Sequence, residues 1–209
     1  MRSLFCLFVA TIILSACQPN RESLPVLGNH IIDPATGDTT YHEIPAFSFV
    51  NQDGQMIRET NLDGKVYIAD FFFISCPTIC PTVARQMKRI HDRFEDDDRL
   101  ALVSYTIDPK RDTVARLKKY ADGLGVASPK WQFLRGEKDV VYDLAQDYMS
   151  IAREDPNAPG GFDHSGWLLL IDDQRHIRSF CNGTEEEAVD KFMEDIDLLL
   201  STMGTATSD

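Results

Sequence analysis

The run of residues 65–73, KVYIADFFF, is the feature that most constrains how this chain can fold. Its apolar residues are nearly continuous instead of alternating, and this pattern predicts a central β-strand covered on both faces. The segment that follows contains two cysteines, Cys76 and Cys80, each directly before a proline. The chain therefore places two reactive side chains just beyond the end of a buried strand.

The remaining pattern predicts strands alternating with helices. Apolar residues at helical spacing indicate helices over 84–94, 112–124 and 137–148, and a capping box at Thr184 predicts a last helix that extends to about Met203. Further strands are expected at 100–107 and 131–134, with β-hairpins at 44–50/55–60 and 167–171/177–181. This order predicts an α/β fold in which helices flank a mixed sheet, with one hairpin at the N-terminal end and a hairpin plus helix at the C-terminal end.

The N-terminal residues have the pattern of an export signal. Arg2 precedes an apolar stretch over 3–16 that is short for a membrane span, although an uncleaved anchor or a buried helix are the alternatives. The sequence Leu-Ser-Ala-Cys ending at Cys17 resembles the lipobox of bacterial lipoproteins. We therefore predict a signal peptide at 1–16, a lipidated Cys17 with a flexible tether over 17–40, and one domain over 41–209. The domain would be lipid-anchored to the cell membrane and would face the periplasm or the cell exterior.

The charge balance argues against nucleic acid as a partner. The 21 Lys and Arg residues are outnumbered by 33 Asp and Glu residues, which gives a formal net charge of -12. No cluster of basic residues offers a track for a phosphate backbone. The acidic excess favours cationic partners at low salt but identifies none.

The cysteines are the candidate reactive groups. Of five cysteines, Cys6 would leave with the signal and Cys17 would be lipidated, so Cys76, Cys80 and Cys181 would remain in the exported domain. The prolines predict that 76–80 is a loop and that Pro81 opens a helix, which places two thiols at a helix N-terminus, where the dipole favours thiolate. Such a pair is a structural disulfide, a redox couple or half of a metal site.

A metal site would need a third ligand, and His164 is the best-placed histidine. It follows an irregular loop over 155–161 and directly precedes an apolar strand, with Asp163 and Ser165 as neighbours that could support the imidazole. From its position alone, a structural histidine is the competing interpretation. The other histidines are expected in the tether, on the polar face of the first helix and in the last hairpin turn: His30, His42, His91 and His176.

Three separated motifs together resemble the Sco/SenC family. They are Phe71–Pro81 with its two cysteines, the segment TIDPKRD over 106–112, and Asp163-His164-Ser165 followed by the strand that ends at Ile171. The similarity extends in order from about residue 44 to residue 192. One departure is Cys181, at a position where the family pattern has an aromatic residue. It is expected to be a buried apolar side chain, and it would complicate metal transfer only if it faced the other two cysteines.

The resemblance implies a thioredoxin-like fold and a copper-binding protein that acts in assembly of the binuclear copper centre of cytochrome c oxidase. It implies Cys76, Cys80 and His164 as copper ligands and assigns Asp108 and Asp112 to an acidic motif, for which a turn and a helix cap are the simpler roles. Its implied partner is the copper-site subunit of the oxidase, with an upstream copper donor or thiol reductant also possible, and the protein is expected to be a monomer. Two thiolates and one imidazole suit Cu(I) and also accept Cu(II).

Two other classes of function use the same residues. A thiol-disulfide reductase would keep a partner's copper-ligand cysteines reduced through Cys76 and Cys80 without metal. A peroxidase or Cys–His hydrolase would use Cys76 as nucleophile and His164 as base, although Cys80 would trap that nucleophile as a disulfide. The leading interpretation is a binding and transfer protein rather than an enzyme, and His164 discriminates it from the reductase.

Overall fold

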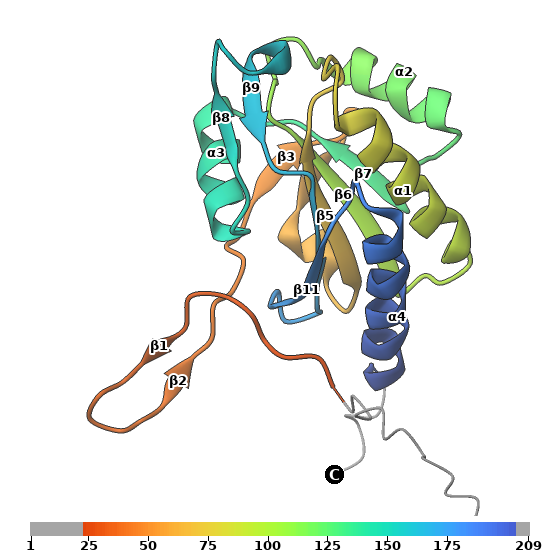
Figure 1. Cartoon of the computed structure of the whole chain (residues 1–209). Helices are drawn as coiled ribbons and strands as arrows, with labels where there is room; N and C mark the ends of the chain where they lie inside the picture. The colour runs from red at the N-terminus through yellow and green to blue at the C-terminus, as the bar shows by residue number, and fades with distance from the viewer. Residues whose placement is uncertain (1–22, 204–209) are drawn as a thin grey trace, which may run out of the picture.

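A five-stranded mixed sheet with the order β11-β10-β5-β6-β7 lies at the centre of the protein (Figure 1). The computed structural model describes residues 23–203, so the predicted signal peptide and Cys17 lie outside the described residues. Strands β5, β6 and β7 run parallel, and β10 pairs antiparallel with both β5 and β11. These strands are β5 Val66–Phe72, β6 Leu100–Thr106, β7 Trp131–Leu134, β10 Trp167–Ile171 and β11 Ile177–Asn182.

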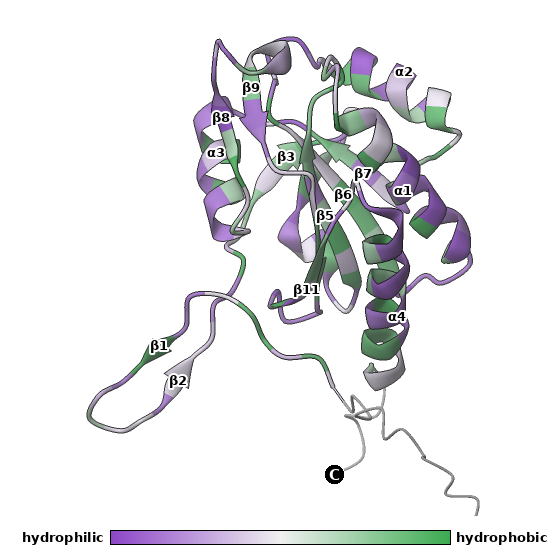
Figure 2. Cartoon of the chain, in the orientation of Figure 1, coloured by the Kyte–Doolittle hydropathy of each residue, from purple (hydrophilic) through white to green (hydrophobic). Residues whose placement is uncertain are grey.

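Helices cover both faces of the sheet. Helices α1, α2 and α4 lie on one side, and α3 lies on the other (Figure 1). The helices are α1 Cys80–Arg93, α2 Val114–Leu124, α3 Lys138–Asp147 and α4 Glu186–Thr202. All seven residues of β5 are buried, as its continuous apolar pattern predicts. Figure 2 shows the hydrophobic residues concentrated on the sheet and the hydrophilic ones on the outer helix surfaces. The predicted α/β class is thus confirmed.

Several elements begin or end at other residues than the sequence predicts; helix α1, for example, begins at Cys80 and not at residue 84. The N-terminal hairpin is shorter than expected, with β3 at Ser48–Val50 and β4 at Met56–Arg58, and the 3-10 helix η1 Glu59–Leu62 follows it. The predicted capping box at Thr184 is wrong. Helix α4 has Glu185 as its N-cap without a side-chain cap bond, because the Thr184 hydroxyl donates to Asn182 Oδ1 at 2.8 Å instead.

A short antiparallel hairpin lies outside the central sheet. Strands β8 Ala152–Glu154 and β9 Phe162–His164 form a two-stranded sheet of their own, joined through the 3-10 helix η2 Pro159–Gly161. Residues 155–161 are expected to form an irregular loop, and the sequence does not predict these strands, since three residues are too few for a periodic pattern. We call residues 152–164 the histidine hairpin.

Part of the predicted tether packs against the domain. Leu24 is buried, the Leu27 amide donates to the Ile177 carbonyl at 2.8 Å, and the Arg178 guanidinium donates to the carbonyls of Leu24 and Pro25. The next residues form a projecting hairpin, β1 Ile31–Ile32 and β2 Thr39–Thr40 (Figure 1). Residues 24–27 therefore add to the edge of the sheet at the end where β10 turns into β11.

None of the helices between residues 23 and 203 combines the length and the apolar character that crossing a membrane would require.

Candidate metal centre

The end of β5 positions both cysteines. After Phe73 the chain turns away from the sheet, and the Cys76 amide donates to the Phe73 carbonyl at 3.1 Å. Helix α1 begins at Cys80, and Pro81 occupies its first turn, where a missing N–H costs nothing because that group has no partner within the helix. We call residues 74–80 the cysteine loop. Both of its thiols are free and buried.

The histidine hairpin brings the imidazole to these thiols. His164 ends β9, and the ring of Phe73 contacts the rings of Phe162 and His164 at centroid distances of 4.9 and 5.3 Å. Gly160 packs so closely that a Cβ atom there would lie 2.7 Å from the Phe73 ring and 3.2 Å from Pro77 Cδ. The hairpin therefore packs directly on the cysteine loop.

The three predicted ligand atoms converge. His164 Nε2 lies 3.5 Å from Cys76 Sγ and 3.5 Å from Cys80 Sγ, and the three ligand atoms lie within 4.8 Å of one another. Metal–sulfur bonds of about 2.3 Å and metal–nitrogen bonds of about 2.0 Å separate the ligand atoms around a single ion by roughly 3.5–4 Å. This is the only group of three or more metal-ligating side chains found within the described residues.

The surroundings of the imidazole favour the tautomer that a metal ligand needs. His164 Nδ1 lies 3.3 Å from the Ser165 carbonyl oxygen, which can only accept, so this contact favours a proton on Nδ1. The lone pair of Nε2 is then directed toward the two sulfurs. Such a hydrogen bond from the remote ring nitrogen fixes ring orientation in metal sites.

The two thiols differ in acidity. Burial opposes ionisation of Cys76, but hydrogen bonds from the backbone N–H groups of Cys80 and Thr78 outweigh it and lower its pKa to about 6. Burial raises the pKa of Cys80 well above its usual value, and the neighbouring Cys76 sulfur adds to that effect. The site therefore holds one thiolate and one thiol at neutral pH.

A buried carboxyl group that is not among the predicted site residues lies beside the site. Asp70, on β5, lines a small cavity together with Cys80 and His164. It accepts a hydrogen bond from Ser104, which in turn accepts one from the Trp131 indole. Burial raises the pKa of Asp70 to about 7, against the opposing effect of the Ser104 bond. The feature of the sequence that points to Asp70 is an acidic residue inside an otherwise apolar strand.

The acidic residues of the 106–112 motif contact the site's supports and not its ligand atoms. Asp112 is buried, and its Oδ2 accepts from the Ile74 amide at 3.1 Å and from the Thr106 hydroxyl at 2.6 Å. Asp108 accepts from the backbone and side chain of Arg111. Asp112 thus fixes the start of the cysteine loop.

Asp163 does not support the imidazole in the way that the sequence suggested. Its Oδ2 accepts two hydrogen bonds from Arg153 across the hairpin, at 2.9 and 2.5 Å. Ser165 supplies its backbone carbonyl to His164, while its hydroxyl bonds to Ser150 at 2.6 Å. Asp163 therefore stabilises the pairing of β8 with β9.

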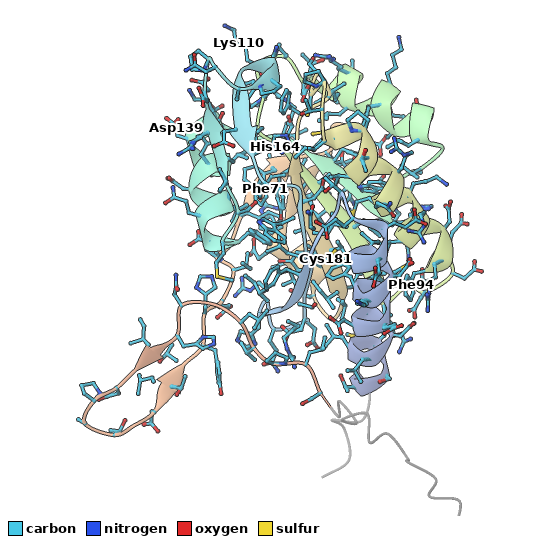
Figure 3. The ribbon with its side chains drawn as sticks, viewed as in Figure 1. Phe71, Phe94, Lys110, Asp139, His164 and Cys181 are labelled. Atoms are coloured by element: carbon cyan, nitrogen blue, oxygen red, sulfur yellow. The ribbon has the colours of Figure 1, made fainter. Side chains whose placement is uncertain are left out.

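Cys181 and His91 lie apart from the ligand group. Cys181 is buried on the face of β11 that carries Ser179, whose hydroxyl donates to Asp195 on α4 (Figure 3). Burial raises the pKa of the Cys181 thiol to about 12. His91, expected on a polar helix face, is instead buried with its ring 6.0 Å from that of Trp131. The spacing of apolar residues along the helix does not reveal that Trp131 lies against His91.

The donor set is soft and incomplete for a tetrahedral ion. Two thiolates and one imidazole suit copper, and a structural zinc site would use a fourth protein ligand. In the absence of metal, the same pair of sulfurs can undergo thiol-disulfide exchange. The geometry therefore permits metal binding and redox exchange at a single position.

Comparison with known proteins identifies the family. The sequence pattern of SCO1/SenC matches residues 35–201. A crystal structure of a SCO1/SenC family lipoprotein from Bacillus anthracis aligns with a TM-score of 0.69 at 25% identity, covering 76% of this chain and 95% of the other.

Two more solved structures show the same arrangement. BsSco, described as a member of the Sco family of cytochrome c oxidase assembly proteins, gives a TM-score of 0.67 at 26% identity over 77% of this chain and 95% of its own. Arabidopsis thaliana ScoI with copper bound gives 0.61 at 25% identity over 73% and 97%. The thioredoxin-like arrangement expected from the motifs is confirmed by these structures. With a match that spans most of its length, this chain belongs to the SCO1/SenC family.

Proposed function

We propose that this protein binds copper through Cys76, Cys80 and His164 and delivers it to the binuclear copper site of cytochrome c oxidase during assembly of that enzyme. The convergence of two sulfurs and one imidazole nitrogen within 4.8 Å carries the proposal. Copper bound to Arabidopsis thaliana ScoI and the description of BsSco as an oxidase assembly protein support it.

The arrangement suits a cargo that must be released. The thiolate of Cys76 is available at neutral pH, while Cys80 loses its proton when the metal binds. With three protein ligands the ion retains an open coordination position, which an incoming thiolate of an acceptor can occupy before the donor ligands leave. The site is thus suited to ligand exchange more than to permanent storage.

Copper titration of His164→Ala tests the copper assignment. Loss of one of three ligands should weaken Cu(II) binding on the order of 100-fold, while the two thiols should still retain Cu(I). His176→Ala, a change of an imidazole in the β10–β11 turn, is the matched control and should bind copper like the wild type. Equal Cu(II) affinity in His164→Ala and wild type would exclude the imidazole as a ligand.

A second candidate function is reduction of a partner's copper-ligand cysteines. The acidity difference between Cys76 and Cys80 favours it, because a low-pKa thiol beside a high-pKa partner is suited to attack and resolution. An experiment in cells distinguishes the two functions. Restoration of oxidase assembly by His164→Ala, with both cysteines intact, would support the reductase and contradict copper delivery.

We also propose that Cys17 is lipidated and that the domain is held on the outer face of the cell membrane. The similarity to a protein described as a lipoprotein supports this anchor. Mass spectrometry of the membrane fraction tests this proposal. The Cys17→Ser variant should be released in soluble form, and its copper binding should be unchanged.

A further inference from the structure

Arg111 contacts the histidine hairpin without contacting any metal ligand. It lies in the segment between β6 and α2, and its Nη2 donates to the Gly160 carbonyl at 3.0 Å. The guanidinium carbon also lies 5.3 Å from the centroid of the Phe162 ring, in cation–π geometry. One side chain thus contacts two residues that precede His164 by four and two positions.

These two contacts fall where the hairpin meets the cysteine loop. Gly160 packs on Phe73 and Pro77, and Phe162 packs on Phe73. The hairpin forms its own two-stranded sheet and has no strand pairing with the central sheet. Its position over the cysteines therefore depends on side-chain contacts such as these.

Arg111 is itself held in place by Asp108. The Asp108 carboxylate accepts hydrogen bonds from the Arg111 backbone N–H, at 3.3 Å, and from its Nε. Asp108 is buried at the end of β6, and its own amide donates to the Thr106 hydroxyl. The guanidinium is therefore oriented from the rigid edge of the sheet toward the hairpin.

The same segment contacts the other half of the site. Asp112 accepts from the Ile74 amide, and Arg116 Nη2 donates to the Ser75 hydroxyl at 2.7 Å. Residues 108–116 thus contact the cysteine loop on one side and the histidine hairpin on the other. A single rigid segment sets the spacing between the thiols and the imidazole.

We propose that Arg111, oriented by Asp108, is a positioning residue that holds His164 at coordinating distance from Cys76 and Cys80. This inference rests on the proposed copper function. The Asp108–Arg111 pair is partly exposed, with the Arg111 side chain 44% accessible, and such a pair adds little to global stability. Loss of this pair should therefore change copper binding more than it changes the melting temperature.

Copper titration of the reduced full-length domain tests the proposal, with Arg111→Ala, Arg111→Lys and Lys110→Ala compared. Lys110 is the adjacent cation and projects into solvent at the outer end of the molecule (Figure 3). In Arg111→Ala we expect Cu(II) to bind about tenfold more weakly, as is typical when the support of a ligand is removed. The thiolate–Cu(II) charge-transfer band and the electron paramagnetic resonance spectrum should also change.

The conservative variant and the control separate positioning from a general effect. Arg111→Lys keeps the charge and one donor and should recover part of the affinity, whereas Lys110→Ala should match the wild type in affinity and spectrum. If Arg111→Ala does not fold, Asp108→Asn, which keeps the side-chain shape but removes the charge that orients Arg111, should give the same weakening.

The outcomes distinguish this inference from the proposed function. A wild-type protein that fails to bind copper would overturn the proposed function itself. A wild type that binds one copper, together with an Arg111→Ala protein of equal affinity and unchanged spectrum, would overturn the positioning role alone. An Arg111→Ala protein that only melts at a lower temperature and keeps its copper spectrum would also overturn it.

Discussion

At the residue scale, the unequal thiols give the first prediction. Hydrogen bonds from backbone N–H groups prevail over burial and lower the pKa of Cys76 to about 6, against about 8.5 for an ordinary thiol. In a Cys80→Ser variant, alkylation of Cys76 by iodoacetamide should slow as the pH falls through about 6. In Cys76→Ser, the remaining Cys80 should react at least tenfold more slowly at pH 7. A midpoint near 8.5 for Cys76 would contradict the thiolate assignment.

Asp70 gives the second prediction at this scale. Its pKa is raised to about 7 by burial, so between about pH 4 and 7 the folded protein holds a proton that the unfolded chain releases. The stability from this proton uptake is fully present below about pH 4 and is lost as the pH rises through 7. Asp70→Asn should therefore gain stability relative to wild type on going from pH 4 to pH 8, by roughly 3–4 kcal/mol.

Chemical denaturation at several pH values measures this difference. Asp173→Asn, at an exposed carboxylate in the β10–β11 turn, is the control and should show no such trend. A stability difference between Asp70→Asn and wild type that is constant from pH 4 to pH 8 would contradict burial of a protonated carboxyl group.

At the element scale, two threonines that lie just before helices should behave differently. Thr113 caps α2, since its hydroxyl oxygen accepts from the Arg116 amide, and the left-handed Gly125 ends that helix. Thr184 does not cap α4. Thr113→Ala should therefore lower the free energy of unfolding by about 1 kcal/mol, and Thr184→Ala should lower it by less. Thermal denaturation of both variants checks this, and an equal or larger loss in Thr184→Ala would restore the predicted capping box.

The elements that the sequence predicts well are those with long periodic patterns. The buried strand that becomes β5, the helix that ends at Gly125 and the hairpin at 172–175 are confirmed because each has several residues of consistent pattern. The short strands are not predicted. β8 and β9 have three residues each, and their pairing depends on contacts between distant residues, such as Phe73 with Phe162.

The candidate site follows the same division. Residue type and motif predict Cys76, Cys80 and His164 as ligands, and the structure brings their ligand atoms together. The roles of Asp70 and Arg111 could not be read from local pattern, because each depends on which strands and loops become neighbours. The supporting residues of a site are thus less predictable than its ligands.

At the scale of the whole molecule, residues 24–27 should fold as part of the domain. Arg178 Nη1 pairs with Asp172 at 2.8 Å while its other nitrogens donate to the Leu24 and Pro25 carbonyls. Arg178→Ala should release this segment and increase amide exchange at Leu27 at least tenfold, with a loss of a few degrees in melting temperature. Lys191→Ala, which removes an exposed pair on α4, is the control. Unchanged exchange at Leu27 would show that the strand pairing with Ile177 is sufficient alone.

The position of this segment determines how the protein would present its cargo. Residues 24–27 join the sheet at the β10–β11 turn, whereas His164 lies beyond the opposite ends of the strands (Figure 3). The seven residues of β5 extend over about 23 Å between these poles. If Cys17 carries the proposed lipid, the chain that leads to it therefore leaves the described part of the domain at the pole opposite the ligands, so that the ligands can face away from the bilayer. An acceptor whose own copper site stands clear of the bilayer by a comparable height could then meet them without either protein leaving the membrane.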